Sequence, residues 1–215
     1  MQAVKVRSLD LLRKKRGLFI VVEGLDGCGK STMARSLAEH FNARQLTTSA
    51  SRFGDAREAM EQAVASDPVA RQMFFATSVA IAAREIRELR AQGESVVLDR
   101  YWLSTLVYGQ VIRKIDLRLD VFEDSLERPD VTFFLDAPAS VRAARLRRRS
   151  ATGEVNLEDW QTLEADRDGP LRAGFIAGLE RQIAGTGVVL DASGDDPQQV
   201  FNAARAEADR LQLAA

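Results

Sequence analysis

Apolar residues in this chain fall in short runs that alternate with stretches of helical spacing. Four runs are compact and apolar enough to predict buried strands, and a fifth, weaker run predicts another. They are Leu18–Val22, Val96–Leu98, Val131–Leu135 and Val188–Leu190, with the weaker one near Gln45–Thr48. Three of these runs are followed directly by an aspartate, at Asp99, Asp136 and Asp191.

Five helical segments separate these runs. They extend from a glycine-rich loop to about Phe41, from Asp67-Pro68 to near Gly93, over Ser140–Arg149, over Leu157–Ala184 with a break at Gly169-Pro170, and from Asp196-Pro197 onward. Asp67 and Asp196 are typical N-cap residues, and each precedes a proline that fits the first helical position. Strands that alternate with helices predict parallel pairing through helical crossovers. We therefore expect a three-layer, doubly wound α/β sheet with ligands at the carboxyl ends of its strands.

No repeat, low-complexity linker or composition shift divides the chain. Its 215 residues therefore predict a single domain over 1–215, which includes a basic N-terminal extension at 1–17. That extension lacks the apolar core of a secretory signal, and it predicts a short surface helix, with a mitochondrial presequence as the weaker alternative. No apolar run reaches the roughly 18–20 residues of a membrane span. We expect a cytoplasmic protein that binds no membrane.

The charge balance narrows the possible partners. Thirty basic residues face 31 acidic ones, so the net charge is −1 and nothing attracts the whole molecule to nucleic acid. The chain holds one cysteine, Cys28, and one histidine, His40, which excludes a disulfide framework, a cysteine-based zinc site and a histidine-rich metal site. Any site for an anionic ligand must be local, and small-molecule nucleotides are the expected partners.

The segment Gly24–Thr32 carries the strongest functional signal. It fits G-x-x-x-x-G-K-[ST] and lies between a predicted strand and a predicted helix, as a P-loop requires. Its glycines let backbone N–H groups point inward, and the helix adds its positive end. The residues expected to bind ATP are Gly24, Gly27, Cys28, Gly29, Lys30, Ser31 and Thr32. A glycine turn that merely joins strand to helix would not explain Lys-Ser at this offset.

Within the loop, we expect Lys30 to reach the β- and γ-phosphates and the Ser31 hydroxyl to ligate Mg²⁺. Cys28 is expected to be a reactive thiol, because nearby N–H groups, Lys30 and a helix N-terminus lower a thiol pKa. The alternative is a small residue chosen for its size.

Other P-loop classes lack their motifs here. A GTPase would carry N-K-x-D and a transporter ATPase L-S-G-G-Q, and neither occurs. Asp166–Gly169 fits D-x-x-G, but it falls inside a late predicted helix. A small-molecule kinase needs only the loop, a carboxylate at a neighbouring strand end, an acceptor pocket and mobile arginines.

Asp99 and Arg100 supply such a strand end. The carboxylate can hold Mg²⁺ or its waters, and the arginine can neutralise phosphate charge. Asp136 also ends a strand, but Ala-Pro follows it, so we interpret it as a turn residue.

At this point several segments resemble the thymidylate kinase family. They are Phe19–Thr32, with its aspartate at 26; Asp99–Tyr108, which fits D-R-Y-x-x-S-x-x-x-Y; Pro129–Asp136, which fits P-D-x-x-[apolar]-x-L-D; and Leu190–Ala192 before a last helix. Asp67–Ile86 and Trp102 look closer still to the thymidylate kinase-like domain of the mitochondrial UMP/CMP kinase. The resemblance spans nearly the whole chain after residue 17 and implies a homodimer.

The resemblance implies roles for single residues. Asp26 would lie near the sugar 3′-hydroxyl, and Arg52 would hold the acceptor phosphate. Phe75 would stack on the base, Arg100 would bridge donor and acceptor phosphates, and Tyr108 would crowd the 2′ position and favour deoxyribose. Phe75 as ordinary core and Tyr108 as plain packing are the alternatives.

Two departures from the family pattern bear on specificity and catalysis. Val79 stands where the family has a base-reading arginine, so we expect sugar to be read more strictly than base. The phosphate loop has no arginine, and Arg145, Arg147, Arg148 and Arg149 are placed like lid arginines, which predicts a lid at about 145–156. A solvated helix face is the alternative for these four.

The sequence thus predicts a nucleoside monophosphate kinase that uses ATP and Mg²⁺, with dTMP and dUMP as the leading acceptors. The residues expected to be catalytic are Lys30, Asp99, Arg100, Arg148 and Arg149, and the metal ligands are Ser31 and Asp99. A deoxynucleoside kinase and a catalytically weak nucleotide-binding or signalling protein are the alternatives.

Overall fold

A computed structural model describes residues 16–48, 53, 56–115, 120–151, 160–194 and 196–214. The predicted Arg52, residues 1–15 of the basic extension and residues 152–156 of the lid lie outside this part of the chain. Within the described residues, no helix is long and apolar enough to cross a membrane.

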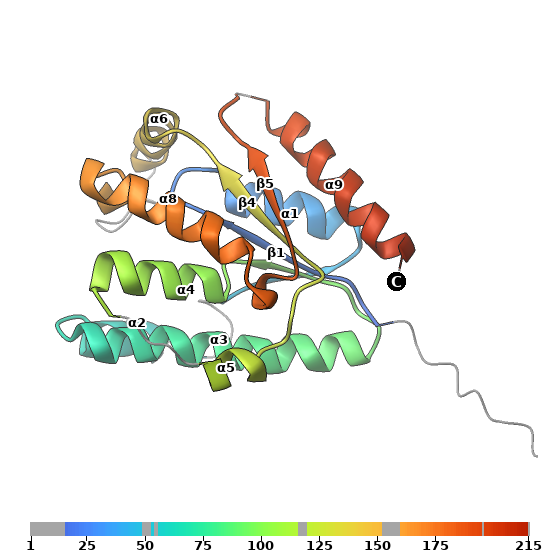
Figure 1. Ribbon diagram of the computed structural model, residues 1–215, viewed down its shortest axis with the longest axis horizontal. Coiled ribbons are helices and arrows are strands. Elements are labelled where there is room, and N and C mark those ends of the chain that lie inside the picture. The colour runs from blue at the N-terminus through green and yellow to red at the C-terminus, as the bar shows by residue number, and fades with distance from the viewer. Residues whose placement is uncertain are drawn as a thin grey trace, which may run out of the picture.

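Five parallel strands form one sheet in the order β2-β3-β1-β4-β5 (Figure 1). Their bounds are β1 Phe19–Gly24, β2 Arg44–Thr47, β3 Val96–Asp99, β4 Val131–Asp136 and β5 Thr186–Asp191. The central strand β1 pairs Val22 with Asp99 on one side and with Phe133 on the other. The strand order changes direction at β1, so the loop after β1 lies where a doubly wound sheet binds ligands.

Helices cover both faces of the sheet. The helical elements are α1 Lys30–His40, α2 Ala56–Val64, α3 Pro68–Ala91, α4 Trp102–Tyr108, the π-helix η1 Gly109–Arg113, α5 Asp120–Ser125, α6 Ala139–Ser150, α8 Ala165–Leu179, the 3₁₀ helix η2 Gln182–Ala184 and α9 Pro197–Ala214. Figure 1 shows α1 and α9 on one side of the sheet and α3, α4 and α8 on the other. The predicted three-layer α/β fold is therefore confirmed.

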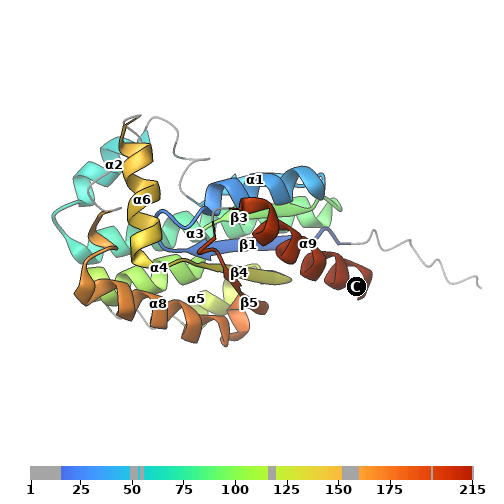
Figure 2. The same ribbon diagram turned by 90° about the horizontal axis from the view of Figure 1, so that it is seen from above.

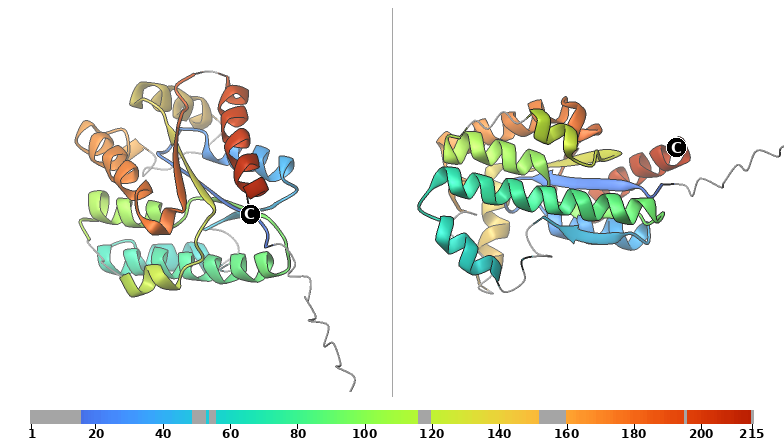
Figure 3. Two further views of the ribbon diagram at one scale, coloured as in Figure 1. Left: turned by 45° about the vertical axis from the view of Figure 1, so that its right-hand side comes forward. Right: turned by 90° about the horizontal axis from the view of Figure 1, so that it is seen from below.

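Two apolar cores follow from the alternation of side chains along β1. Phe19 and Val21 point into a core shared with α3, α4 and α8, whereas Ile20 and Val22 point into a core shared with α1 and α9. Both faces of β1, β3 and β4 are buried, so these three strands are mostly apolar, as is typical of parallel sheets. In the view from below in Figure 3, α3 runs along the sheet as its longest cover.

Most predicted boundaries agree with the structure. Asp67 caps α3 by accepting from the N–H groups of Val69 and Ala70 at 2.8 and 3.0 Å, and Asp196 accepts from Gln198 at 2.9 Å. These caps satisfy N–H groups that no helical carbonyl can reach.

The helix predicted at Leu157–Ala184 is wrong in extent and in its break. The helix α8 covers Ala165–Leu179 without interruption at Gly169-Pro170. Pro170 is exposed and lies near the N-terminal end, so the hydrogen bond that it cannot donate falls in the solvated first turns. The sequence pattern also did not predict α2, α4 with η1, or α5.

Candidate functional site

The loop between β1 and α1 has the backbone of an anion cradle. Gly27 and Gly29 have φ angles of 86° and 105°, a region that side chains disfavour. A Cβ on Gly27 would also lie 2.7 Å from the carbonyl oxygen of Arg142. Gly29 caps α1 without a side chain, so the N–H groups of the first helical turn face the loop and carry the positive end of the helix dipole.

Lys30 is buried within this loop. Its Nζ donates to the carbonyl oxygen of Leu25 at 3.0 Å and lies 3.7 Å from Asp26 Oδ1. The ammonium group is therefore held over the loop and partly neutralised by one carboxylate. An incoming phosphate would meet a cation that is already in position.

Ser31 and Asp99 meet at the carboxyl end of neighbouring strands. The Ser31 Oγ donates to Asp99 Oδ2 at 2.6 Å, because β3 lies beside β1 and Asp99 pairs with Val22. Within the described part of the chain, Asp99 Oδ1 is the one buried side-chain polar atom without a hydrogen-bond partner. A hydroxyl and an unsatisfied carboxylate oxygen are the hard donors that Mg²⁺ prefers.

Asp26, Arg100 and Tyr108 form a partly buried polar cluster beside the loop. Asp26 pairs with the Arg100 guanidinium, and the Tyr108 hydroxyl donates to Asp26 Oδ2 at 2.9 Å. Burial alone would raise the pKa of Asp26, but the charges of Arg100 and Lys30 outweigh it and hold that pKa below its ordinary value. Asp26 is thus a carboxylate that links two cations.

Arg100 is held in an unusual backbone conformation. Its φ is 67°, in the left-handed region, and its carbonyl oxygen accepts from the Thr48 hydroxyl. Such strain persists where surrounding contacts impose it, commonly at functional sites. The turn directs the guanidinium from the end of β3 back toward Asp26.

Glu23 holds the following turn, a role that the sequence analysis missed. Its carboxylate is fully buried and accepts from the N–H groups of Tyr101 and Ser104 at 2.9 and 3.2 Å, and from the Ser104 hydroxyl. Burial raises its pKa, and these hydrogen bonds offset only part of that effect. The signal was available in the sequence as an acid inside the apolar run that forms β1.

The predicted lid arginines of α6 differ in whether the protein holds them in place. Arg145 donates to the carbonyl oxygens of Ala192 and Gly194 at 3.0 and 2.7 Å, so the structure fixes it rather than leaving it mobile. Arg147, Arg148 and Arg149 are exposed on the last turn. Figure 2 shows α6 at the end of the molecule where β1 terminates.

A cleft of about 480 Å³ joins most of these groups. It is lined by Asp26, Gly27, Gly29, Lys30, Ser31, Thr32, Thr47, Asp99, Arg100, Arg145 and Arg149. An adjoining hollow of about 340 Å³ is lined by Cys28, Gly29, Thr32, Arg148 and residues of the last helix, among them Gln198 and Phe201. The predicted catalytic residues thus lie around two neighbouring hollows at the carboxyl ends of the strands.

Arg142 ties this cleft to α8, and the sequence analysis did not single it out. Its guanidinium is fully buried, donates to the Asp26 carbonyl oxygen at 3.2 Å and pairs with Asp168. It also donates to the Thr162 carbonyl oxygen at 3.3 Å. One arginine at the base of α6 thereby connects the phosphate loop with the chain before α8.

The expected reactivity of Cys28 is wrong. The side chain is 2% exposed, and burial raises the pKa of the thiol despite the nearby charge of Lys30. The thiol points into the apolar core beneath the loop. Cys28 is therefore a small core residue, the alternative that the sequence left open.

Asp136 is also not a simple turn residue. It accepts from Arg172 Nε at 2.8 Å and from Arg172 Nη2 at 2.6 Å, a bidentate pair. The partner comes from α8, and local sequence around Asp136 carries no sign of it.

Phe74 and Phe75 separate as adjacent helical residues should. Phe74 is 5% exposed within the protein, whereas Phe75 is half-buried and faces two arginines, Arg71 and Arg113. Val79, one turn further along α3, is fully buried in the core. Trp102 is likewise buried and packs on Phe122, as expected for a packing residue.

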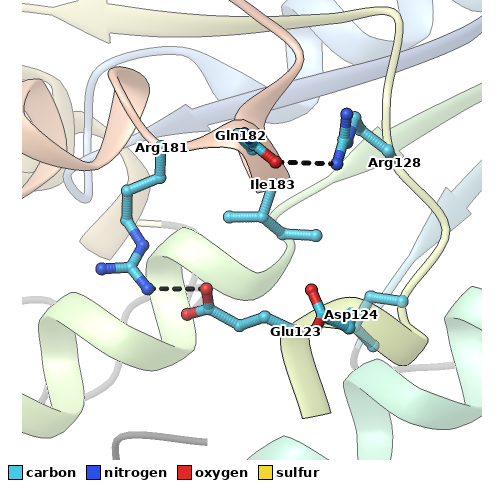
Figure 4. A pocket seen from close by; sticks show the side chains of 7 residues that line it. Glu123, Asp124, Arg128, Arg181, Gln182 and Ile183 are labelled. Carbon is cyan, nitrogen blue, oxygen red and sulfur yellow. Dashed lines mark hydrogen bonds and ion pairs between the residues drawn. The ribbon is translucent and has the colours of Figure 1, made fainter. Parts of the chain in front are cut away.

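A further hollow of about 440 Å³ lies at the opposite edge of the sheet, where β4 and β5 begin (Figure 4). In this hollow Arg181 pairs with Glu123 at 2.6 Å, and Arg128 donates to the amide oxygen of Gln182 at 3.4 Å. It contains no glycine-rich loop and faces away from Lys30.

The glycine loop between β1 and α1 carries Lys30 and Ser31, and Ser31 contacts the Asp99 carboxylate. This arrangement defines a P-loop nucleotide-binding protein of the α/β class. A family model described as thymidylate kinase matches residues 22–169. The chain belongs to the thymidylate kinase family.

Individual relatives agree with this assignment. A thymidylate kinase of Cereibacter sphaeroides is 36% identical over 200 residues, which cover 86% of this chain and 91% of the relative. A probable thymidylate kinase of Archaeoglobus fulgidus is 31% identical over 185 residues, which cover 82% and 87%. The solved structure of thymidylate kinase from Candida albicans shares the fold with a TM-score of 0.70 at 20% identity, covering 92% of this chain and 93% of that one.

Proposed function

We propose that this protein is an ATP-dependent nucleoside monophosphate kinase that phosphorylates a deoxypyrimidine monophosphate, with dTMP as the leading acceptor. Membership of the thymidylate kinase family supports the reaction class. The observation that carries the proposal is that Lys30, Asp99 and Arg100 line one cleft.

The donor would bind along the phosphate loop. The N–H groups of Gly27, Gly29 and the first turn of α1 would cradle its phosphates, and Lys30 would neutralise the outer two. The exposed arginines of α6, Arg148 and Arg149, would close on the same phosphates and supply the positive charge that the loop itself lacks.

Ser31 and Asp99 would hold the Mg²⁺ ion that accompanies ATP. The unsatisfied Asp99 Oδ1 fits this role, because a buried carboxylate oxygen without a partner is costly unless a ligand contacts it. When bound, Mg²⁺ neutralises developing charge on the transferred phosphoryl group.

The acceptor would lie on the other side of Arg100. That guanidinium would bridge the two phosphates, Asp26 would contact the sugar, Phe75 would carry the base and Tyr108 would exclude a 2′-hydroxyl. Arg52 is proposed to hold the acceptor phosphate. The protein would contribute positioning and charge stabilisation, with little covalent chemistry of its own.

A deoxynucleoside kinase is the main alternative activity. Its acceptor has no phosphate and would leave Arg100 without an anion to bridge, and for that reason we rank it second. A homodimer remains a prediction from the family resemblance, and a cytoplasmic location remains a prediction from the sequence.

The test is ADP release measured across thymidine, dTMP, dUMP, dCMP and UMP with Mg-ATP. We expect turnover with deoxypyrimidine monophosphates and none with thymidine. Lys30→Ala should lower kcat by about 100-fold or more, as loss of a donor to developing charge does. Arg35→Ala is the matched control, because Arg35 is an exposed cation on the same helix. Near wild-type turnover of Lys30→Ala would show that the site is misassigned.

A further inference from the structure

Two guanidinium groups lie over the ring of Phe75. Arg113 Cζ lies 5.0 Å from the ring centroid and Arg71 Cζ lies 5.8 Å from it. Val79 follows Phe75 by one helical turn, but its side chain is fully buried and apolar. A base on Phe75 would therefore meet Arg113 from η1 and Arg71 from an earlier turn of α3, and no polar group from position 79.

Arg113 is built into its position. Its Nε donates to Gln72 Oε1 at 2.7 Å, and its Nη2 lies 3.4 Å from the carbonyl oxygen of Thr105. Gln72 is 1% exposed, and its Nε2 donates to the same carbonyl oxygen at 3.0 Å. The second bond fixes which way the Gln72 amide points, so its oxygen faces Arg113.

The backbone supports this arrangement. Arg113 ends the π-helix η1, which continues α4 and begins at Gly109. A Cβ on Gly109 would lie 2.6 Å from Gln72 Nε2, so a larger residue there would displace the Gln72 amide. Wider turns of this kind re-aim side chains, frequently at functional sites.

Around Arg113, the hydrogen-bonding groups left for a ligand are donors and not acceptors. The guanidinium has five N–H groups, and the bonds to Gln72 and Thr105 use two of them. The nearby acceptor oxygens, Gln72 Oε1 and the Thr105 carbonyl, already receive hydrogen bonds. The remaining N–H groups of the Arg113 guanidinium are therefore the hydrogen-bonding groups available to a ligand at Phe75, and they can only donate.

Arg113 keeps its charge at neutral pH. Burial, together with the neighbouring charge of Arg71, lowers its pKa to about 10. A ligand acceptor beside Arg113 would offset the cost of its partial burial, because the bonds to Gln72 and Thr105 bring no negative charge.

We propose that Arg113, positioned by Gln72, reads the acceptor base: it donates to a carbonyl oxygen at C4 of the pyrimidine and so selects thymine and uracil over cytosine. This inference rests on the proposed function, since it places the base on Phe75. Cytosine carries an amino group at C4, which would set N–H groups against N–H groups. Rejection of the wrong polar group is the strongest form of discrimination that a small site can make.

The experiment compares kcat/KM for dTMP, dUMP and dCMP in wild type, Arg113→Met, Arg113→Lys and the control Arg84→Met. Arg84 is an exposed arginine on α3. Wild type should favour dTMP and dUMP over dCMP. Arg113→Met should lower kcat/KM for dTMP and dUMP by about 10- to 100-fold, mainly through KM, and change dCMP by less than about threefold. Arg113→Lys should restore part of the preference, and Arg84→Met should keep it.

A purely structural role for Arg113 would lower all three acceptors together and leave their ratios unchanged, and that result would overturn the inference while the proposed function stands. Calorimetric binding of dTMP and dCMP separates the two claims. If no monophosphate is phosphorylated, the proposed function fails. Selective loss of dTMP binding in Arg113→Met would then still support the inference, and unchanged or absent binding would overturn it.

Discussion

Replacing Asp26 with asparagine should leave Arg100 and Lys30 without the carboxylate that now compensates their charges. The amide keeps the shape of the side chain but removes the negative charge between Arg100 and Lys30. The side chains of Asp26 and Lys30 are 11% and 7% exposed, so water compensates little, whereas Arg100 is 30% exposed. Breaking a buried pair costs about 3–5 kcal/mol. Because Arg100 is partly solvated, we expect the lower end, about 3 kcal/mol.

For a chain of this size, each kcal/mol lowers Tm by about 2–4 °C, so Asp26→Asn should lose about 6–12 °C. The cleft also gains one unit of positive charge. An effective dielectric constant near 20 gives about 2 kcal/mol for a unit charge at about 8 Å, so ATP should bind roughly tenfold more tightly or better. Turnover should nevertheless fall, because Arg100 loses the group that orients it.

Asp136→Asn is the matched control. It removes a carboxylate from the end of the neighbouring strand β4, but its partner Arg172 is half exposed. Exposed ion pairs contribute about 0–1 kcal/mol, so Tm should change by less than about 4 °C and ATP affinity should not rise. Thermal denaturation and calorimetry measure both effects. If the two variants match in Tm and in ATP affinity, the reasoning about the buried cluster is refuted.

Three further outcomes follow from the same site. Burial raises the pKa of Glu23 above 4.5, so the folded state binds this proton more readily than the unfolded state. As the pH rises from 4.5 through the pKa of the folded state, Glu23 therefore lowers the free energy of unfolding. The stability of Glu23→Gln relative to wild type should therefore increase from pH 4.5 upward in denaturant titrations, and a flat difference would argue against it. Tyr108→Ala should admit UMP whereas Tyr108→Phe should not, because only alanine removes the ring; UMP turnover by both or neither would count against a steric wall. Maleimide should label Cys28 slowly in the native protein and quickly in denaturant, and rapid native labelling would contradict its burial.

The sequence predicted the sheet and its site edge well because the signals there are local. Apolar runs mark the strands, Asp67-Pro68 marks the start of α3, and the loop at 24–32 carries its own pattern. The extent of α8 was not predictable in this way. A Gly-Pro pair usually interrupts a helix, but Pro170 lies early enough in α8 to be tolerated.

Contacts between distant segments were beyond the sequence. Arg113 meets Gln72 across 41 positions, and no motif marks either residue. The environment of Cys28 was misjudged because loop chemistry lowers a thiol pKa, whereas the direction of the side chain, into the core, decides the outcome. Val79 faces the core, so position 79 presents no hydrogen-bonding group beside Phe75; which residue reads the base stays a prediction.

The product of the reaction tests the central claim most directly. Wild-type protein is incubated with dTMP and Mg-ATP, and the nucleotides are separated by anion exchange and identified by ³¹P NMR. The account predicts dTDP and ADP in equal amounts, and no dTMP formed when thymidine replaces dTMP. Phosphorylation of thymidine, or ADP released without dTDP, would contradict it.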